Sequence, residues 1–94
     1  MPRLVWLPEA LDDLDRLYDF IAEHSEHAAE TSATKIVHSA KTLLDFPRKG
    51  RPYPDDAQYR ELTVASGSRG YIIRYRASDE EVTIMRVWHQ LEDR

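Results

Sequence analysis

The sequence contains 94 residues, of which 41% are hydrophobic and 32% charged, and its formal net charge is −4. This length provides one hydrophobic core, so we expect a single domain over residues 1–94 with the composition of a soluble globular protein. The absence of cysteine excludes a disulfide framework and a thiolate zinc site. The N-terminus has no long apolar segment, and no run approaches membrane-spanning length, which predicts a cytoplasmic protein without membrane contact.

The charges are distributed unevenly along the chain. Residues 1–30 contain eight acids and two bases, a net charge of −6, whereas residues 31–94 contain nine acids and eleven bases, a net charge of +2. Acidic charge is therefore concentrated in the first predicted helix, and basic charge near residues 48–51 and in the last strands. A globally acidic chain is a poor general nucleic-acid binder, but a local basic patch suits an acidic partner.

The first half of the chain predicts a short strand and a helical hairpin. Residues 3–7 are rich in Leu, Val and Trp, which favours a strand. Pro8 suits the first turn of a helix because its missing N–H costs nothing there, and apolar residues at helical spacing extend this helix to about residue 23. A second apolar stripe predicts a helix over residues 28–45, and the short connection between the two predicts an antiparallel pair. Pro47 ends the second helix, because a residue before proline avoids the helical region.

The second half predicts a loop followed by three strands. Residues 48–56 contain a glycine and two prolines and are interpreted as the loop. The strand-like segments cover residues 59–64, 71–76 and 82–88, with turns at 66–68 and 78–80. The predicted fold class is α+β, in which a strand, a two-helix hairpin and a three-stranded antiparallel meander form one sheet covered on one face by the helices.

Side-chain alternation assigns faces to the last two strands. We expect Tyr71, Ile73 and Tyr75 to face the helices, which leaves Arg74 and Arg76 on the opposite face, either as a solvated surface or as a functional one. In the last strand, regular alternation groups Val82, Ile84, Arg86 and Trp88 on one face and Thr83, Met85, Val87 and His89 on the other. Both groups are largely apolar, so this strand is predicted to be central.

Arg86 and His89 are the polar residues of interest on the last strand. Arg86 needs a partner among its apolar neighbours, because an unpaired buried charge is costly, and we expect an acid of the first helix or Glu61 to provide it. His89 is either an ordinary rim residue or a general acid or base, since imidazole exchanges protons near neutral pH. The four histidines lack the spacing of a metal site and the three glycines do not form a phosphate loop, so no metal and no cofactor are expected.

Several motifs in sequence order resemble the RelE/ParE superfamily of toxins from bacterial type II toxin–antitoxin modules. They are Trp6-x-Pro8-x-Ala10-x-x-Asp13-Leu14, Leu44-x-x-Pro47-x-x-Gly50-Arg51-Pro52, Arg60-Glu61-Leu62, Tyr71-Ile72-Ile73-Arg74-Tyr75-Arg76 and Ile84-x-Arg86-Val87-Trp88-His89. The resemblance covers nearly the whole chain and rests on the order and spacing of these pieces.

The resemblance implies one of two activities and one partner. RelE-like members are similar to small ribonucleases that cut messenger RNA on the ribosome with basic residues of the open sheet face and often a C-terminal Tyr or His. ParE-like members share the fold and inhibit DNA gyrase. Both imply a cognate antitoxin and a hetero-oligomer with it. A ribonuclease would use His89, Arg74 and Arg76 as catalytic residues. The candidates for target or antitoxin contact are Arg60, Arg74, Arg76, Arg86, Trp88 and His89.

Two departures from the ribonuclease pattern favour the ParE-like branch. Ile72 occupies the position after the strand-opening aromatic where those members carry a basic residue, and Gln90 and Leu91 follow His89 where they often place Arg or Tyr. Attack by a ribose 2′-hydroxyl needs a base, an acid and positive charge for the transition state, and the sequence lacks a complete set. The leading prediction is a ParE-like toxin that inhibits DNA gyrase and is neutralised by a cognate antitoxin. The alternatives are a ribosome-dependent mRNA endonuclease, with Arg60 as a further possible cation, and a binding module that has lost toxicity.

Overall fold

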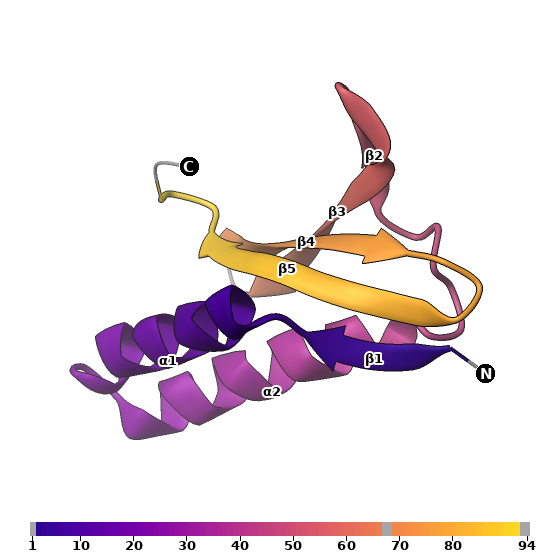
Figure 1. The fold of residues 1–94 in the computed structure, drawn as a ribbon. Helices are drawn as coiled ribbons and strands as arrows, with labels where there is room; N and C mark the ends of the chain where they lie inside the picture. Colours follow the sequence, from indigo (N-terminus) through magenta and orange to yellow (C-terminus); the bar gives the residue numbers. More distant parts are fainter. Residues whose placement is uncertain (1, 67–68, 93–94) are drawn as a thin grey trace.

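The chain folds into two layers, a mixed β-sheet and a pair of helices packed on one of its faces (Figure 1). The computed structural model describes residues 2–66 and 69–92. In chain order its elements are β1 (Arg3–Trp6), α1 (Pro8–Ala22), α2 (Glu26–Thr42), β2 (Arg51–Tyr53), β3 (Asp56–Ser66), β4 (Arg69–Ala77) and β5 (Glu81–His89). The predicted α+β class, with a helical hairpin over one face of a sheet, is confirmed.

Both helices begin where the sequence provides a start signal. α1 begins at Pro8, as predicted, because proline fits the first helical turn. α2 begins at Glu26, earlier than the predicted Ala28, because the Ser25 side chain accepts a hydrogen bond from the Ala28 N–H at 3.1 Å and caps the helix. α2 ends at Thr42, before the predicted boundary, because the residues that follow form hydrogen-bonded turns.

The strands lie in the order β1-β5-β4-β3-β2. β3, β4 and β5 are antiparallel to one another, which confirms the predicted meander. β1 adds to the sheet in parallel with β5, from Arg3 beside Glu81 to Trp6 beside Ile84. β1 and β5 are therefore neighbours, and the central position predicted for β5 holds over residues 81–84, where β1 and β4 flank it, but not over the rest of the strand.

The segment predicted as a loop at residues 48–56 contains a further strand. β2 pairs antiparallel with the start of β3, with Arg51 opposite Glu61 and Pro52 opposite Arg60, and this hairpin extends away from the helices (Figure 1). Proline is tolerated on an edge strand where its missing N–H is not needed, so the prolines did not prevent strand formation. Of the turn predicted at 66–68, residues 67 and 68 lie outside the described residues.

The core lies between the helical hairpin and one face of the sheet. Tyr71, Ile73 and Tyr75 of β4 are buried there, which confirms the face predicted for them. The other large and fully buried side chains are Ile36 and Leu43, from α2 and the turn after it, and Val82, Ile84 and Val87, from β5. Neither described helix combines the length and the apolar character needed to cross a membrane.

An irregularity in β5 corrects the predicted faces of this strand. Arg74 pairs with Arg86, but the next residue, Tyr75, pairs with Ile84, which leaves Met85 as an extra residue in a β-bulge. Because side chains alternate with a period of two, one extra residue reverses the alternation for the rest of the strand. The core face therefore takes Val82, Ile84 and Val87, and the opposite face takes Arg86 and Trp88.

Candidate functional site

The residues predicted to contact a partner are distributed over both faces of the sheet. Arg74 and Arg76 of β4 lie on the open face, away from the helices, because the residues that alternate with them are buried in the core. Trp88 shares this face through its pairing with Ile72. His89 lies on the helix-covered face, opposite the buried Tyr71. The structure therefore does not gather the predicted residues into one patch.

On the open face, arginine and aromatic side chains stack in a continuous series. The guanidinium carbon of Arg74 lies 4.7 Å from the ring centre of Tyr53 and 4.8 Å from that of Trp88. The guanidinium carbon of Arg86 lies 5.1 Å from the ring centre of Trp88. Cations at these distances are attracted to the faces of aromatic rings, so the series binds β2, β4 and β5 together. Trp88 is 7% exposed, which leaves little of its ring for a partner.

The two arginines of this series are also paired with carboxylates. Arg74 donates hydrogen bonds to Glu61 Oε2 from Nε at 3.3 Å and from Nη2 at 3.0 Å. Arg86 donates to both oxygens of Asp13, at 2.8 Å from Nε and 3.1 Å from Nη2. The expected partner of Arg86, an acid of the first helix, is confirmed. Both guanidinium groups therefore hold the fold together as well as lining the open face.

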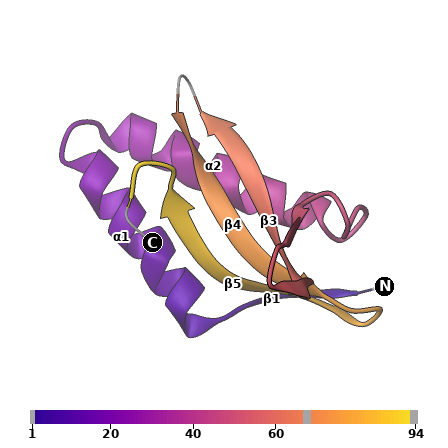
Figure 2. The ribbon, with the colours of Figure 1, turned by 90° about the horizontal axis from the view of Figure 1, so that it is seen from above.

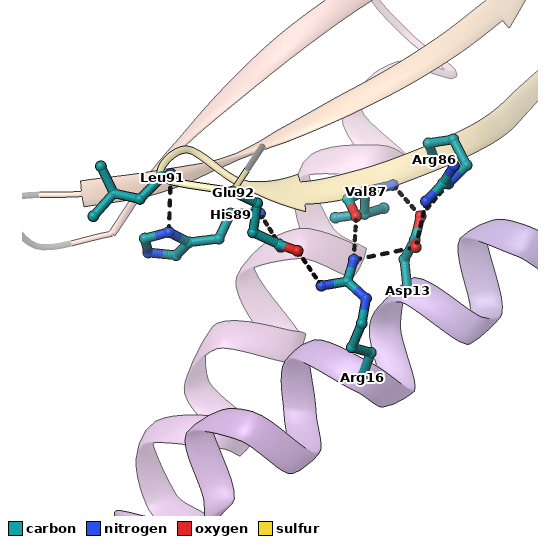
Figure 3. Close-up of polar contacts among 7 residues, drawn as sticks. All are labelled: Asp13, Arg16, Arg86, Val87, His89, Leu91 and Glu92. Carbon is teal, nitrogen blue, oxygen red and sulfur yellow. Dashed lines mark hydrogen bonds and ion pairs between the residues drawn. The ribbon is translucent and has the colours of Figure 1, made fainter. Parts of the chain in front are cut away.

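The carboxylate of Asp13 connects α1 to the middle of β5 (Figure 3). Asp13 is 4% exposed and accepts hydrogen bonds from Arg86, from the Val87 N–H at 2.8 Å and from Arg16 Nη2 at 3.2 Å. Burial alone would raise the pKa of Asp13, but the hydrogen bonds from Arg86, Val87 and Arg16 outweigh it and hold the pKa below its ordinary value. Sequence reasoning missed this role, although an acid inside the apolar stripe of α1, next to Leu14, was a usable signal.

Side chains also close the edge of β5 beyond the end of β1. There the Val87 N–H donates to Asp13, and the Val87 carbonyl accepts from Arg16 Nη2 at 3.3 Å. The His89 N–H donates to Glu92 Oε1 at 2.9 Å, and Glu92 in turn pairs with Arg16 (Figure 3). These contacts replace the missing neighbouring strand and protect an otherwise open edge.

His89 is engaged by its surroundings on the helix-covered face. Its ring meets that of Tyr71 edge to face, with 5.5 Å between the ring centres. Its Nδ1 accepts a hydrogen bond from the Leu91 N–H at 3.1 Å. Arg74 and Arg76 project from the other side of the sheet, so the three residues predicted for RNA cleavage do not share a site. In the described part of the chain, no group of His, Asp and Glu side chains is arranged to hold a metal ion.

An apolar groove lies between α1 and the end of β5. Its volume is about 500 Å³, and its lining residues include Arg16, Phe20, Ile21, Tyr71, His89 and Leu91. Phe20 and Leu91 are each 67% exposed, which is unusual for large apolar side chains that lie close together. Sequence reasoning identified His89 here but missed Phe20, whose position on the helix surface gave no signal.

Arg60, the remaining predicted contact residue, anchors the loop that follows α2. Its Nη1 donates to the Gly50 carbonyl at 2.8 Å. Beside it, the buried Tyr75 hydroxyl donates to the Pro47 carbonyl at 2.7 Å and accepts from the Gly50 N–H at 2.9 Å. Burial raises the pKa of Tyr75, and the hydrogen bond from Gly50 and the charge of Arg60 only partly offset this. These contacts hold the loop against the sheet.

Comparison with known proteins identifies one toxin family, in which some similar proteins are named ParE or ParDE and others RelE. The family model for the ParE toxin of the type II toxin–antitoxin system, parDE, matches residues 4–94. Toxin RelE2 of Caulobacter vibrioides is 36% identical over 89 residues, which cover 95% of this chain and 96% of the relative. Toxin RelE3 of the same organism is 32% identical over 87 residues, covering 93% and 92%. A solved chain of the chromosomal ParDE TA system from P. aeruginosa has a TM-score of 0.77 at 25% identity, covering 95% of this chain and 96% of that one.

Proposed function

Because this chain belongs to the ParE toxin family of type II toxin–antitoxin systems, we propose that it inhibits DNA gyrase by binding and that a cognate antitoxin neutralises it. One observation favours binding over RNA cleavage. His89 lies on the helix-covered face of the sheet, whereas Arg74 and Arg76 lie on the open face. A general base and the cations that stabilise a phosphorane-like transition state must reach the same phosphate, and these residues do not.

The hydrogen bonds of these side chains support the same conclusion. The Nδ1 atom of His89 already accepts the Leu91 N–H. Arg74 already binds Glu61 and stacks on Trp88. These contacts give His89 and Arg74 structural roles in the fold, which supports inhibition by binding over a mechanism that uses both side chains in catalysis.

For the antitoxin, we propose a helical segment whose apolar face fills the groove beside Phe20 and Leu91. Amphipathic helices recognise grooves of this kind through apolar anchors at helical spacing. The Phe20→Glu variant should weaken antitoxin binding at least about tenfold, a change of about 1.4 kcal/mol. Phe46→Glu is a matched control because Phe46 is 65% exposed, against 67% for Phe20, and does not line the groove. Equal loss of affinity in both variants would exclude the groove.

The target is tested by inducible expression of the chain alone in bacteria, with chromosome and messenger RNA integrity followed in parallel. Gyrase inhibition predicts blocked replication and a DNA-damage response while messages stay intact. With purified components, the chain should reduce supercoiling by gyrase. A supercoiling assay without any effect at high toxin excess would contradict the proposal.

A ribosome-dependent mRNA endonuclease is the second candidate, favoured by the RelE names of the relatives that are 36% and 32% identical. Under this candidate, messages are cleaved rapidly after induction and His89→Ala abolishes the cleavage. His38→Ala, which changes an exposed histidine of α2, is the matched control. Intact messages with the unmodified chain would eliminate this candidate, whereas cleavage that persists in His89→Ala would exclude His89 as its catalytic residue.

A further inference from the structure

Each edge strand of the sheet covers only part of its neighbour. β1 pairs with residues 81–84 of β5, and β2 pairs with β3 only as far as Glu61 (Figure 2). The uncovered part of β5 is closed by side chains of α1 and of the C-terminal turn. Within the described residues, no strand lies along the outer edge of residues 62–66 of β3. An uncovered strand edge is a template for an additional strand.

The outward backbone groups of this β3 segment belong to Thr63 and Ala65. In an antiparallel pair, each residue directs its N–H and C=O groups to the same side. The Gly70 carbonyl accepts a hydrogen bond from the Gln90 N–H at 2.9 Å on the β5 side, so Gly70 does not bond to Ala65, which lies opposite it on β3. Ala65, and Thr63 two residues earlier, therefore direct both groups away from β4, towards the uncovered edge.

The space beside this edge has room for a chain and carries positive charge. A cavity of about 310 Å³ is lined by Lys49, Arg51, Glu61 and Thr63, among others. Lys49 and Arg51 are exposed. The acid that also lines the cavity, Glu61, is already paired with Arg74 at 3.0 Å. An incoming strand therefore meets two exposed cations next to two residues with outward backbone groups.

From these observations we propose that the β3 edge at residues 62–66 binds an extended peptide segment with acidic side chains as an additional strand. Its backbone bonds to Thr63 and Ala65, and its carboxylates pair with Lys49 and Arg51. Resting on the proposed function, this segment belongs to the antitoxin. A second copy of this chain fits less well, because its own residues 62–66, Leu-Thr-Val-Ala-Ser, offer no carboxylate to Lys49 and Arg51.

The open edge is tested first on the free protein, by amide hydrogen exchange measured with NMR. The Thr63 and Ala65 amides should exchange at least about tenfold faster than the Val87 and His89 amides on the closed β5 edge, because amides without an acceptor lack protection. Equal protection at the two edges would overturn the assignment of an open edge.

Binding is tested with a capped hexapeptide of alternating Glu and Val titrated into the isotope-labelled chain. We expect exchange of the Thr63 and Ala65 amides to slow at least about threefold at saturation, because added hydrogen bonds protect them. A Lys-Val hexapeptide of equal length should not bind, and neither should the Glu-Val peptide N-methylated at alternate residues, which removes the donors of one edge. Binding that leaves both amides unchanged would overturn the proposal.

Two variants locate the site independently of one another. Lys49→Glu/Arg51→Glu should weaken peptide binding at least about tenfold by like-charge repulsion, whereas Lys35→Glu on the exposed face of α2 should not change it. Thr63→Pro removes one outward N–H and should weaken binding similarly, and thermal unfolding verifies that it remains folded. Full affinity in the double variant would refute the site even if Thr63→Pro fails to fold.

The same variants distinguish the strand site from the proposed function. Peptide binding and amide exchange do not depend on gyrase, so a failed supercoiling assay leaves their result intact. In the reverse case, the Lys49→Glu/Arg51→Glu variant inhibits gyrase normally and keeps full affinity for the antitoxin. This result would overturn the strand site and leave the proposed function standing.

Discussion

Replacing Asp13 with alanine should lower the free energy of unfolding by about 2–4 kcal/mol. The Asp13 carboxylate is the acceptor for the buried Val87 N–H at 2.8 Å, and leaving that donor without a partner costs about 1–3 kcal/mol. The bonds from Arg86 and Arg16 contribute about 1 kcal/mol together. They contribute no more because these arginines are 42% and 43% exposed and water replaces part of their loss.

The assay for Asp13→Ala is urea unfolding followed by circular dichroism. With a slope of about 1–1.5 kcal/mol per molar urea for a chain of this size, the midpoint should fall by about 2 M. Asp15→Ala is the control, because Asp15 is exposed on the same helix and its replacement gains the same helix propensity of about 0.5 kcal/mol. If the two variants unfold within about 0.5 kcal/mol of each other, the role assigned to the Asp13 carboxylate is refuted.

Three further predictions concern stability at low pH, the buried hydroxyl of Tyr75 and the close contact between Gly70 and β3. Despite burial, hydrogen bonds hold the pKa of Asp13 and of Glu92 below their ordinary values. The two carboxylates therefore stabilise the folded state fully above their unfolded pKa of about 4, and this stabilisation is lost as pH falls through the folded pKa. Urea midpoints measured at decreasing pH should fall steeply, and less steeply in Asp13→Asn. Tyr75→Phe should cost about 1–3 kcal/mol in urea unfolding, because it leaves the Gly50 N–H without its acceptor; an unchanged midpoint contradicts this. Gly70→Ala should lower the thermal midpoint by about 4–8 °C or more, because its Cβ would lie 2.3 Å from a backbone oxygen of β3.

The layer arrangement could be predicted because it depends on periodic apolar patterns. The stripes of both helices and the alternation Tyr71, Ile73, Tyr75 are long enough to identify the buried faces. The ion pair between Arg86 and an acid of the first helix could be predicted as well, although its buried member is Asp13 and the Arg86 side chain is 42% exposed. The sequence did not identify which of several helix acids would serve, because that choice depends on how α1 lies beside β5.

The features that could not be predicted leave no periodic signal. The bulge at Met85 inserts one residue into a strand whose two faces are both apolar, so either register satisfies the hydrophobic pattern. β2 is three residues long and contains Pro52, which favours a loop on composition alone. His89 follows the bulge in β5 and therefore lies on the helix-covered face, whereas Arg74 of β4 lies on the open face.

The parallel pairing of β1 with β5 has a consequence for synthesis. Arg3 lies beside Glu81, so β1 has no partner until β5 has left the ribosome. The helical hairpin forms from contacts close in sequence and closes early, whereas the sheet depends on contacts that span nearly the whole chain and form slowly. An unfinished chain lacks β5, the Val87 backbone that Asp13 binds and one wall of the apolar groove. The surface proposed for the antitoxin helix therefore forms only after residues 81–92 have been translated.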